Sequence, residues 1–236
     1  MKIKEMDTLN KNDNISEEKV HIQPEFIQPW SNLIVRIKLP DEALKELQKV
    51  YDYTMKDWKS FGDQLVGQIE QEPEVTTKIR EKFPDWINFC LQGVVNFVRQ
   101  QTQQNMFAEP ERWKEFCEDE VLARIGTMWF VNQKPGEYNP VHVHTNCKVS
   151  SVVYLKTPKK QIRDRKPHWQ SDGKITFMNN SGTDFNFANA QCSFTPVAGD
   201  MYVFGALQHH MVWPYRSTDP DDTRISLSFN ADVTLK

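Results

Sequence analysis

Hydrophobic positions recur with two different periods along this chain of 236 residues, and the change comes near residue 120. Before it, apolar residues fall at three- and four-residue steps, as on one face of an α-helix. Pro40 and Asp41 provide a start for the first helix, and residues 74–104 carry the second. A short third helix is expected to start at Pro110. The predicted inward positions are Leu44, Leu47, Val50, Tyr51, Met55 and Trp58; Trp86, Phe89, Cys90, Val94, Phe97 and Val98; and Trp113, Phe116 and Cys117.

After residue 120, short apolar runs separated by turn residues replace the helical spacing. The turns contain Pro135-Gly136, Asp172-Gly173 and Ala198-Gly199-Asp200. Short strands at this spacing predict an all-β barrel or a double-sheet jelly roll rather than a parallel sheet. The predicted strands are Leu122–Val131, Val141–His144, Val149–Leu155, Lys174–Met178, Met201–Phe204, Met211–Trp213 and Thr223–Asn230.

These patterns predict an α+β protein with helices first and a β-sandwich second. Residues 1–20 are polar and mixed in charge, and we expect a disordered leader there. Residues 21–120 are expected to form short edge strands (within 21–39) and support helices, with a loop at 60–73. Residues 121–236 are expected to form the jelly-roll catalytic core. The helical part and this core should pack into one compact unit.

Charge and composition limit the binding partners and the cellular compartment that we expect for the protein. The net charge of −3 and the pI near 6.1 argue against nucleic acid or an anionic membrane as a partner. The sequence shows no secretory signal and no apolar run of membrane-spanning length. Four cysteines lie far apart in the sequence and form no CxxC pair. We therefore expect reduced thiols in a cytoplasmic protein that does not enter the membrane.

Two of the six histidines are separated by a single residue, as His142 and His144. If this segment is a strand, alternation places both imidazoles on one face, and Val141 and Val143 on the other. Two imidazoles that share a face form half of a metal site. The remaining ligands must then come from another part of the fold.

A second pair of histidines can complete that site. His209 and His210 follow the apolar run 201–204, so that either could line the same cavity. His210 lies 66 residues after His144 and 14 residues before Arg224. A histidine in a core is more often a hydrogen-bonded structural residue than a ligand. The order and spacing of all these residues together favour the metal site.

The last predicted strand alternates strictly between apolar and polar residues. Ile225, Leu227 and Phe229 share one face, while Arg224 and Ser226 lie on the other. Because the first three must be core, Arg224 should point into the barrel cavity. A guanidinium there can bind a carboxylate in a bidentate manner. An arginine at such a position can also be a salt-bridge partner within the protein.

Taken in order, these elements resemble the 2-oxoglutarate- and iron(II)-dependent oxygenases, in particular a prolyl-hydroxylase-like branch common in bacteria and phages. The resemblance extends over about residues 125–232, and it implies a double-stranded β-helix (jelly-roll or cupin-like) with N-terminal support helices. It also implies the cytoplasm of a bacterium or of a phage-infected host cell. The matching elements are Trp129 and Asn132, Gly136, His142 with His144, Ser151 through Tyr154-Leu155, Gly173 to Phe177, Gly199-Asp200 to Phe204, His210 to Pro214, and Arg224 to Asn230.

The resemblance assigns His142, His144 and His210 to the metal. Better-known members have a carboxylate at the position of His144, as part of a two-histidine, one-carboxylate triad. Three neutral imidazoles leave the ferrous site at a charge of +2, which a 2-oxoglutarate dianion neutralises. Asn146 is a weaker alternative ligand.

The same resemblance assigns the far carboxylate of 2-oxoglutarate to Arg224 and Ser226. Tyr154 could contribute a hydroxyl from a neighbouring strand, or could be an ordinary core tyrosine. The basic segment 156–166 is expected to be either a solvated loop or a lid over the site.

The implied function is a dioxygenase that uses Fe(II), 2-oxoglutarate and O2. It would hydroxylate an unactivated C–H bond of a peptide or a small molecule, and would convert 2-oxoglutarate to succinate and CO2. Two other classes stay open. One is a cupin-like metal-binding protein or isomerase without oxygenase activity, and the other is a structural β-sandwich that has lost the ancestral carboxylate.

Overall fold

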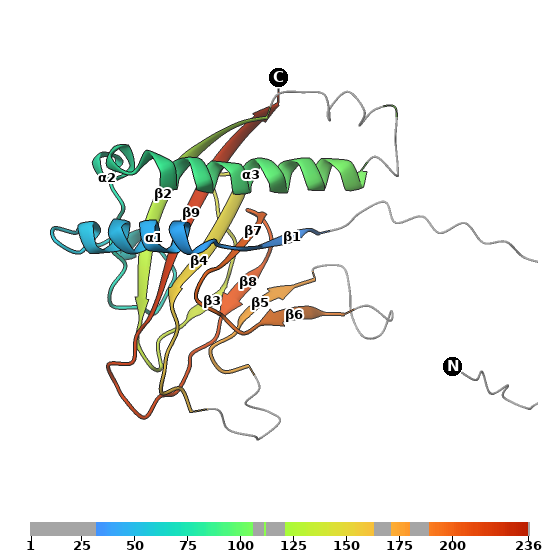
Figure 1. Ribbon diagram of the computed structural model, residues 1–236. Coiled ribbons are helices and arrows are strands. Elements are labelled where there is room, and N and C mark those ends of the chain that lie inside the picture. Colours follow the sequence, from blue (N-terminus) through green and yellow to red (C-terminus); the bar gives the residue numbers. More distant parts are fainter. Residues whose placement is uncertain (1–31, 106–110, 112–120, 163–170, 180–188, 236) are drawn as a thin grey trace, which may run out of the picture.

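Two antiparallel sheets face each other in the computed structural model, which describes residues 32–105, 111, 121–162, 171–179 and 189–235 (Figure 1). The five-stranded sheet has the order β1 (Ile34–Lys38), β7 (Asp200–Gly205), β4 (Val149–Lys156), β9 (Arg224–Leu235) and β2 (Val121–Gln133). The four-stranded sheet has the order β3 (Asn139–His142), β8 (His210–Val212), β5 (Ile175–Met178) and β6 (Gln191–Phe194). The predicted jelly roll, a double-stranded β-helix, is confirmed.

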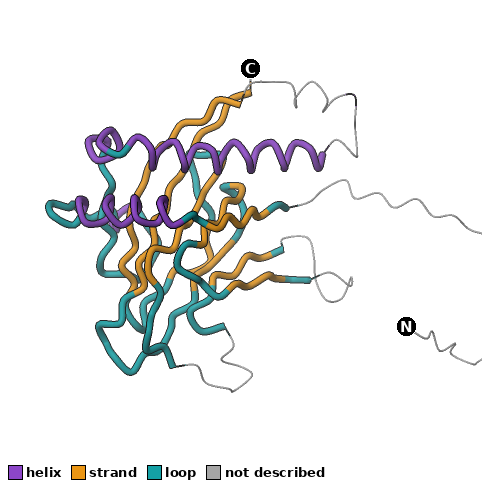
Figure 2. The backbone as a smooth tube through the Cα atoms, in the orientation of Figure 1, coloured by secondary structure: helices purple, strands orange, loops and turns teal. Residues whose placement is uncertain are grey.

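Helices cover the outer face of the five-stranded sheet. The helical elements are α1 (Asp41–Thr54), the short 3-10 helix η1 (Gly62–Gln64), α2 (Thr77–Lys82) and α3 (Pro84–Asn105). Figure 2 shows the long helices as one layer, with the strands on one side of it. The second predicted helix is divided at Pro84, because the residue before a proline is disfavoured in helical geometry. Phe83 accordingly leaves that geometry, with φ −121° and ψ 62°. The first helix ends at Thr54, four residues before the predicted Trp58.

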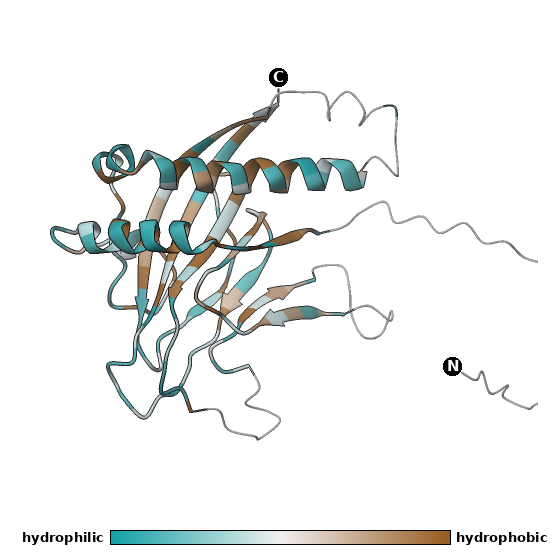
Figure 3. Cartoon of the chain, in the orientation of Figure 1, coloured by the Kyte–Doolittle hydropathy of each residue, from teal (hydrophilic) through white to brown (hydrophobic). Residues whose placement is uncertain are grey.

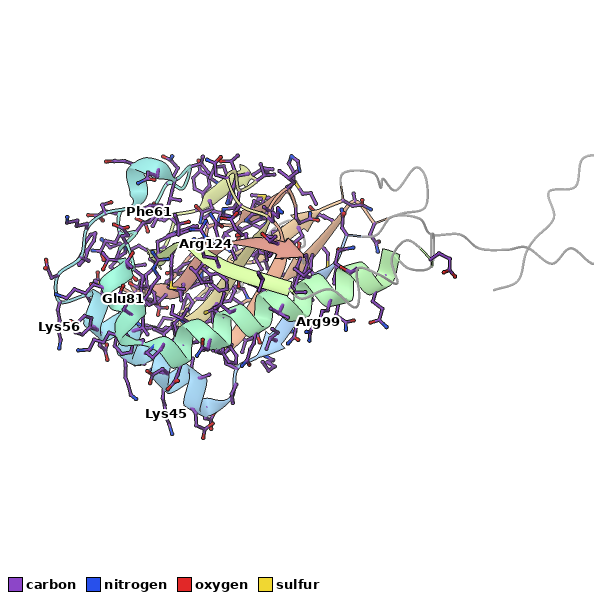
Figure 4. All side chains as sticks on the ribbon, turned by 90° about the horizontal axis from the view of Figure 1, so that it is seen from above. Lys45, Lys56, Phe61, Glu81, Arg99 and Arg124 are labelled. Carbon is purple, nitrogen blue, oxygen red and sulfur yellow. The ribbon has the colours of Figure 1, made fainter. Side chains whose placement is uncertain are left out.

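The main hydrophobic core lies between these helices and the large sheet. Leu47 and Val50 of α1 are fully buried there, and so are Cys90 and Val94 of α3. The hydropathy colouring in Figure 3 shows brown patches on the helices and strands that meet in this core. Lys45 and Arg99, labelled in Figure 4, are exposed residues of the same helices. The apolar stripes predicted from the sequence are therefore the faces that bury α1 and α3.

The predicted edge strand near the N-terminus is β1, which pairs with β7 at one edge of the large sheet. Arg36 and Lys38 of β1 both form ion pairs with Asp200, whose side chain is fully buried. These ion pairs attach the edge strand to its neighbour β7. The expected leader (1–20), residues 21–31 and most of the expected third helix (112–120) lie outside the described residues.

Three local expectations differ from the structure. The strand β3 ends at His142, so that His144 lies beyond it, where its backbone N–H donates to the carbonyl of Ala206 at 2.9 Å. Val141 is 47% exposed, because β3 is an edge strand with one face in solvent. The strand β6 was not predicted. Its four residues QCSF are too few to show a period, and both backbone pairing with β5 and the packing of Phe194 on Phe177 and Tyr202 hold them in place.

The basic segment 156–166 is described only as far as Ile162. In that part, Lys160 forms an ion pair with Asp219, and the backbone N–H groups of Lys159 and Lys160 donate to the carboxylate of Asp222. These contacts tie the described part of the segment to residues 219–222. The remaining residues of the expected lid, with His168 and Trp169, lie outside the described residues. No helix in the described ranges is long and apolar enough to cross a membrane.

Candidate functional site

A cavity of 310 Å³ lies between the two sheets. The inward faces of β2, β4 and β9 form one wall, and β5, β8 and the residues after β3 form the opposite wall. The segment that follows α1 closes one side with Phe61, Leu65, Val66 and Glu72. The segment after α1, the five-stranded sheet and the four-stranded sheet all contribute to the lining. The cavity therefore forms only when the whole fold is assembled.

Three histidines meet at this cavity. His142, the last residue of β3, pairs in register with His210, the first residue of β8. Their ring centroids are 4.2 Å apart, and the ring of His144 lies 5.2 Å from His142 and 5.1 Å from His210. The nitrogens that face one another all lie within 4.8 Å, so that the group could hold a metal ion. The convergence predicted from the sequence is therefore seen.

Backbone carbonyls orient two of these rings. Nδ1 of His142 lies 2.7 Å from the carbonyl oxygen of Pro140, and Nδ1 of His210 lies 2.8 Å from that of Gln208. When each Nδ1–H donates to its carbonyl, the lone pair on Nε2 faces the cavity, which is the arrangement typical of metal-bound histidines. Burial lowers the pKa of both rings, and it lowers the pKa of His144 to about 4. All three imidazoles are therefore neutral at pH 7, as ligands must be.

The spacing of one pair of nitrogens fits a shared ion. Nε2 of His144 and Nε2 of His210 are 3.3 Å apart. Two nitrogens that each lie about 2.0–2.1 Å from one ion, at an angle of about 90–110°, are about 2.9–3.4 Å apart. Asn146 also lines the cavity, whereas His209 is exposed and is not part of the converging group.

Arg224 occupies a different part of the same cavity and is only 2% exposed. Its guanidinium donates to the carbonyl of Gly173 and to Oε1 of Gln133. It also lies near the rings of Tyr154 and Tyr215, at 5.9 and 5.6 Å from their centroids. No carboxylate of the described residues lies within ion-pair distance of it. A buried cation without a counter-charge strongly favours the binding of an anion.

Two hydroxyl-bearing residues lie beside this cation. Tyr154 and Ser226 are partners in the register of β4 and β9, and both line the cavity. The buried hydroxyl of Tyr154 has no hydrogen-bond partner among the described residues. Burial raises the pKa of Tyr154 to about 12, so that this hydroxyl stays protonated and can donate. Arg224, Ser226 and Tyr154 together make a cradle that could hold a carboxylate.

Gln133 was not singled out in the sequence. It pairs in register with Arg224, accepts from its guanidinium, and donates to the carbonyl of Glu137. The sequence pattern that indicates Gln133 is the alternation of Trp129, Val131 and Gln133 on one face of β2, and this face lines the cavity. Its role is to fix the direction of the guanidinium.

Glu72 also went unnoticed, because it lies in the segment predicted to be a loop. That segment runs along the outer edge of β2, where Asn132 N–H donates to the carbonyl of Gln71 and Phe130 N–H to that of Pro73. The Glu72 side chain is 2% exposed and lines the cavity, and its Oε2 has no hydrogen-bond partner among the described residues. Burial and the nearby carboxylate of Glu137 raise the pKa of Glu72 to about 7.

This raised pKa predicts a pH-dependent effect of Glu72→Gln on the free energy of unfolding. A carboxyl group whose pKa is raised on folding contributes stability below its unfolded-state pKa, and that contribution is lost as the pH rises through about 7. The isosteric amide carries no such dependence. Each pKa unit corresponds to about 1.4 kcal/mol, so the gain from Glu72→Gln should grow by about 2–3 kcal/mol between pH 5 and pH 8. Urea denaturation of both proteins across this range measures it.

Glu70→Gln is the matched control. Glu70 is exposed and forms an ion pair with Lys134, which holds the pKa of Glu70 below its ordinary value. Such a group contributes stability above its unfolded-state pKa, so its removal should bring no gain as the pH rises. Equal pH profiles for Glu72→Gln and the wild type would show that the Glu72 carboxyl is not confined as the structure indicates.

With this geometry in place, the comparison with known families becomes informative. The family model described as "Putative 2OG-Fe(II) oxygenase" matches residues 127–230, a range that contains all three histidines and Arg224. The chain is similar to this oxygenase family over that range. Its cofactor and cosubstrates are therefore iron(II), 2-oxoglutarate and O2. Among curated protein sequences, none matches this chain.

Solved structures that match this chain include three oxygenases, of which the first has a similar fold. A prolyl hydroxylase from Trichoplax adhaerens, in complex with a peptide fragment of hypoxia inducible factor, is 11% identical with a TM-score of 0.52, over 86% of this chain and 84% of that one. A prolyl-4-hydroxylase from Pseudomonas putida is 16% identical with a TM-score of 0.45, over 85% and 93%. A 2OG-Fe(II) oxygenase family protein from Burkholderia pseudomallei is 13% identical with a TM-score of 0.34, over 47% of this chain and 43% of that one.

Proposed function

We propose that the protein hydroxylates an unactivated C–H bond of a peptide or small-molecule substrate and converts 2-oxoglutarate to succinate and CO2. His142, His144 and His210 hold the iron, and residues 121–236 form the catalytic core that the helices support. The convergence of three neutral imidazoles beside an uncompensated buried arginine carries this proposal. Iron(II) supplies the oxidative chemistry when it is bound with 2-oxoglutarate and O2.

The protein's own residues bind and orient the cosubstrate. Arg224 donates to the far carboxylate of 2-oxoglutarate, and the hydroxyls of Ser226 and Tyr154 donate to the same group. The apolar side chains of Val131, Val152 and Ile175 line the cavity between these donors and exclude water from the keto acid. Three neutral ligands and Fe(II) carry a charge of +2, so the bound dianion makes the centre neutral.

A cupin-like metal-binding protein without oxygenase activity does not require the anion-binding group of Arg224, Ser226 and Tyr154. Such a protein needs the three imidazoles, but it gains nothing from a buried guanidinium and an unpartnered tyrosine hydroxyl in the same cavity. A structural β-sandwich without activity needs neither. A peptide substrate is one possibility that the Trichoplax structure suggests, since the protein in it is a prolyl hydroxylase in complex with a peptide fragment.

Anaerobic titration with Fe(II) and 2-oxoglutarate tests the proposal directly. A weak visible charge-transfer band arises only when the metal and the keto acid bind at one centre, so this band should appear with both and with neither alone. If Fe(II) binds and 2-oxoglutarate leaves the spectrum unchanged, the cupin-like alternative is correct. If Fe(II) itself does not bind, the structural β-sandwich is correct.

Tyr154→Phe should weaken the binding of 2-oxoglutarate without affecting the binding of the metal. The substitution removes one buried hydroxyl and leaves the ring in place, and a hydrogen bond to a carboxylate contributes about 1.5–3 kcal/mol. The concentration of 2-oxoglutarate that gives half-maximal succinate formation should therefore rise about tenfold or more. Tyr202→Phe is a suitable control, because the hydroxyl of Tyr202 faces Asp200, 3.5 Å away. Equal dependence on 2-oxoglutarate in Tyr154→Phe and the wild type would remove Tyr154 from the cradle.

A further inference from the structure

The cavity has a second charged group that neither the metal nor 2-oxoglutarate accounts for. Glu72 is 2% exposed, lines the cavity, and leaves its Oε2 without a hydrogen-bond partner among the described residues. Within the described ranges, no lysine or arginine forms an ion pair with it. The neighbouring Glu137 adds further negative charge rather than neutralising it. A buried carboxylate in such surroundings favours the binding of a cation.

Two glycines leave room for this carboxylate. A methyl group added to Gly62 would lie 3.2 Å from Oε2 of Glu72, and one added to Gly67 would lie 3.2 Å from Oε1. The added methyl on Gly67 would also overlap the side-chain oxygen of Asn139, which lines the same cavity. The backbone therefore approaches the carboxylate from two sides, and any larger residue would crowd it.

Aromatic rings connect the neighbourhood of Glu72 with the histidines. The backbone N–H of Phe61 donates to the carbonyl of Glu72 at 2.8 Å. The ring of Phe61 lies 5.3 Å from that of Trp129, whose ring in turn lies 6.1 Å from that of His144. Phe61 and Trp129 both line the cavity. An aliphatic stem can pack on these rings, and a cationic head attached to it gains from the negative ring faces.

We infer that Glu72 is a specificity-determining residue that binds the positively charged group of the substrate, a guanidinium or ammonium on an aliphatic stem, as in an arginine or lysine side chain. The stem lies along Phe61 and Trp129, which brings its carbons toward the three histidines. This inference rests on the proposed function, because it uses the same cavity and the same metal centre. It adds the chemical class of the substrate.

Matched pairs of small probes test the inference. N-acetyl-L-arginine amide and N-acetyl-L-citrulline amide have nearly the same shape, and only the first carries a charge. Calorimetric titration at pH 8 into the full chain with Fe(II) and 2-oxoglutarate under nitrogen should give at least tenfold tighter binding of the arginine compound. N-acetyl-L-lysine amide against N-acetyl-L-norleucine amide repeats the comparison for an ammonium. In Glu72→Gln the preference for the charged probe should fall to about twofold or less.

Further variants and conditions separate the possible failures. Glu72→Asp keeps the charge but moves it back by the length of one methylene group, so its preference for the charged probe should lie between those of the wild type and Glu72→Gln. Glu70→Gln should keep the wild-type preference. The titrations are repeated without metal and 2-oxoglutarate. A preference for the charged probe that persists there supports the role of Glu72 even if the proposed oxygenase function is wrong. Failure of both charged probes to bind, equal binding of charged and neutral probes, or an unchanged preference in Glu72→Gln would each overturn the inference.

Discussion

Replacing His210 by alanine is expected to abolish the consumption of 2-oxoglutarate. His210 is buried, its Nδ1 is fixed by the carbonyl of Gln208, and its Nε2 lies 3.3 Å from that of His144. The substitution removes one of the three converging nitrogens. The loss of a metal ligand therefore affects metal binding and every reaction step that depends on the bound metal. Succinate formation with Fe(II), 2-oxoglutarate and O2 should fall by more than a hundredfold.

His209→Ala is the matched control for this substitution. His209 is the adjacent residue in the sequence, but its side chain is exposed and lies outside the converging group. Its removal should leave succinate formation close to the wild-type rate. Thermal unfolding of both variants, measured without metal, shows whether His210→Ala still folds. Turnover at the wild-type rate in a folded His210→Ala protein would falsify the metal assignment.

Local alternation in the sequence was enough to predict one wall of this site. Ile225, Leu227 and Phe229 lie in the core against the helices, while Arg224 and Ser226 face the cavity, as their positions in the strand require. The same rule works for β4, where Tyr154 faces the cavity and Val153 faces the helices. Period-two patterns predict direction well wherever both faces of a strand are buried against different surroundings.

The pairings across the cavity could not be predicted in this way. Gln133 and Arg224 are 91 residues apart, and only the register of β2 against β9 makes them neighbours. Glu72 reaches the cavity because its segment runs along the edge of β2, and nothing in a Gly- and Glu-containing loop indicates such an edge. Strand β6 was missed because its four residues are too few to show a period, although Phe194 packs on Phe177 and Tyr202.

If His144 is the third metal ligand, as we propose, the metal centre has an unusual charge. The described residues place no carboxylate with the three imidazoles, so that the positive charge of the ion is not reduced by its protein ligands. The carboxylate beside the keto group of 2-oxoglutarate would offset one of these two charges, and the far carboxylate would pair with Arg224. Binding of the cosubstrate should accordingly depend on electrostatic attraction at both ends of the molecule.

Arg224→Ala is expected to raise the dissociation constant of 2-oxoglutarate by more than tenfold, with metal binding unchanged. The guanidinium is buried, its direction is fixed by Gln133 and the carbonyl of Gly173, and no carboxylate of the described residues neutralises it. A hydrogen bond from such a group to a carboxylate contributes about 1.5–3 kcal/mol, and about 1.4 kcal/mol already corresponds to a factor of ten. Anaerobic titration of 2-oxoglutarate into the Fe(II)-loaded variant measures the change.

Arg224→Lys separates charge from geometry at this position. Lysine keeps a positive charge, but it loses the planar fork that donates at once to Gln133, Gly173 and the ligand. Its affinity for 2-oxoglutarate should therefore lie between those of the wild type and Arg224→Ala. Arg99→Ala, which removes an exposed arginine from α3, should leave that affinity unchanged (Figure 4). If Arg224→Ala binds 2-oxoglutarate as tightly as the wild type does, the buried guanidinium serves the fold alone, and the cupin-like alternative gains the stronger position.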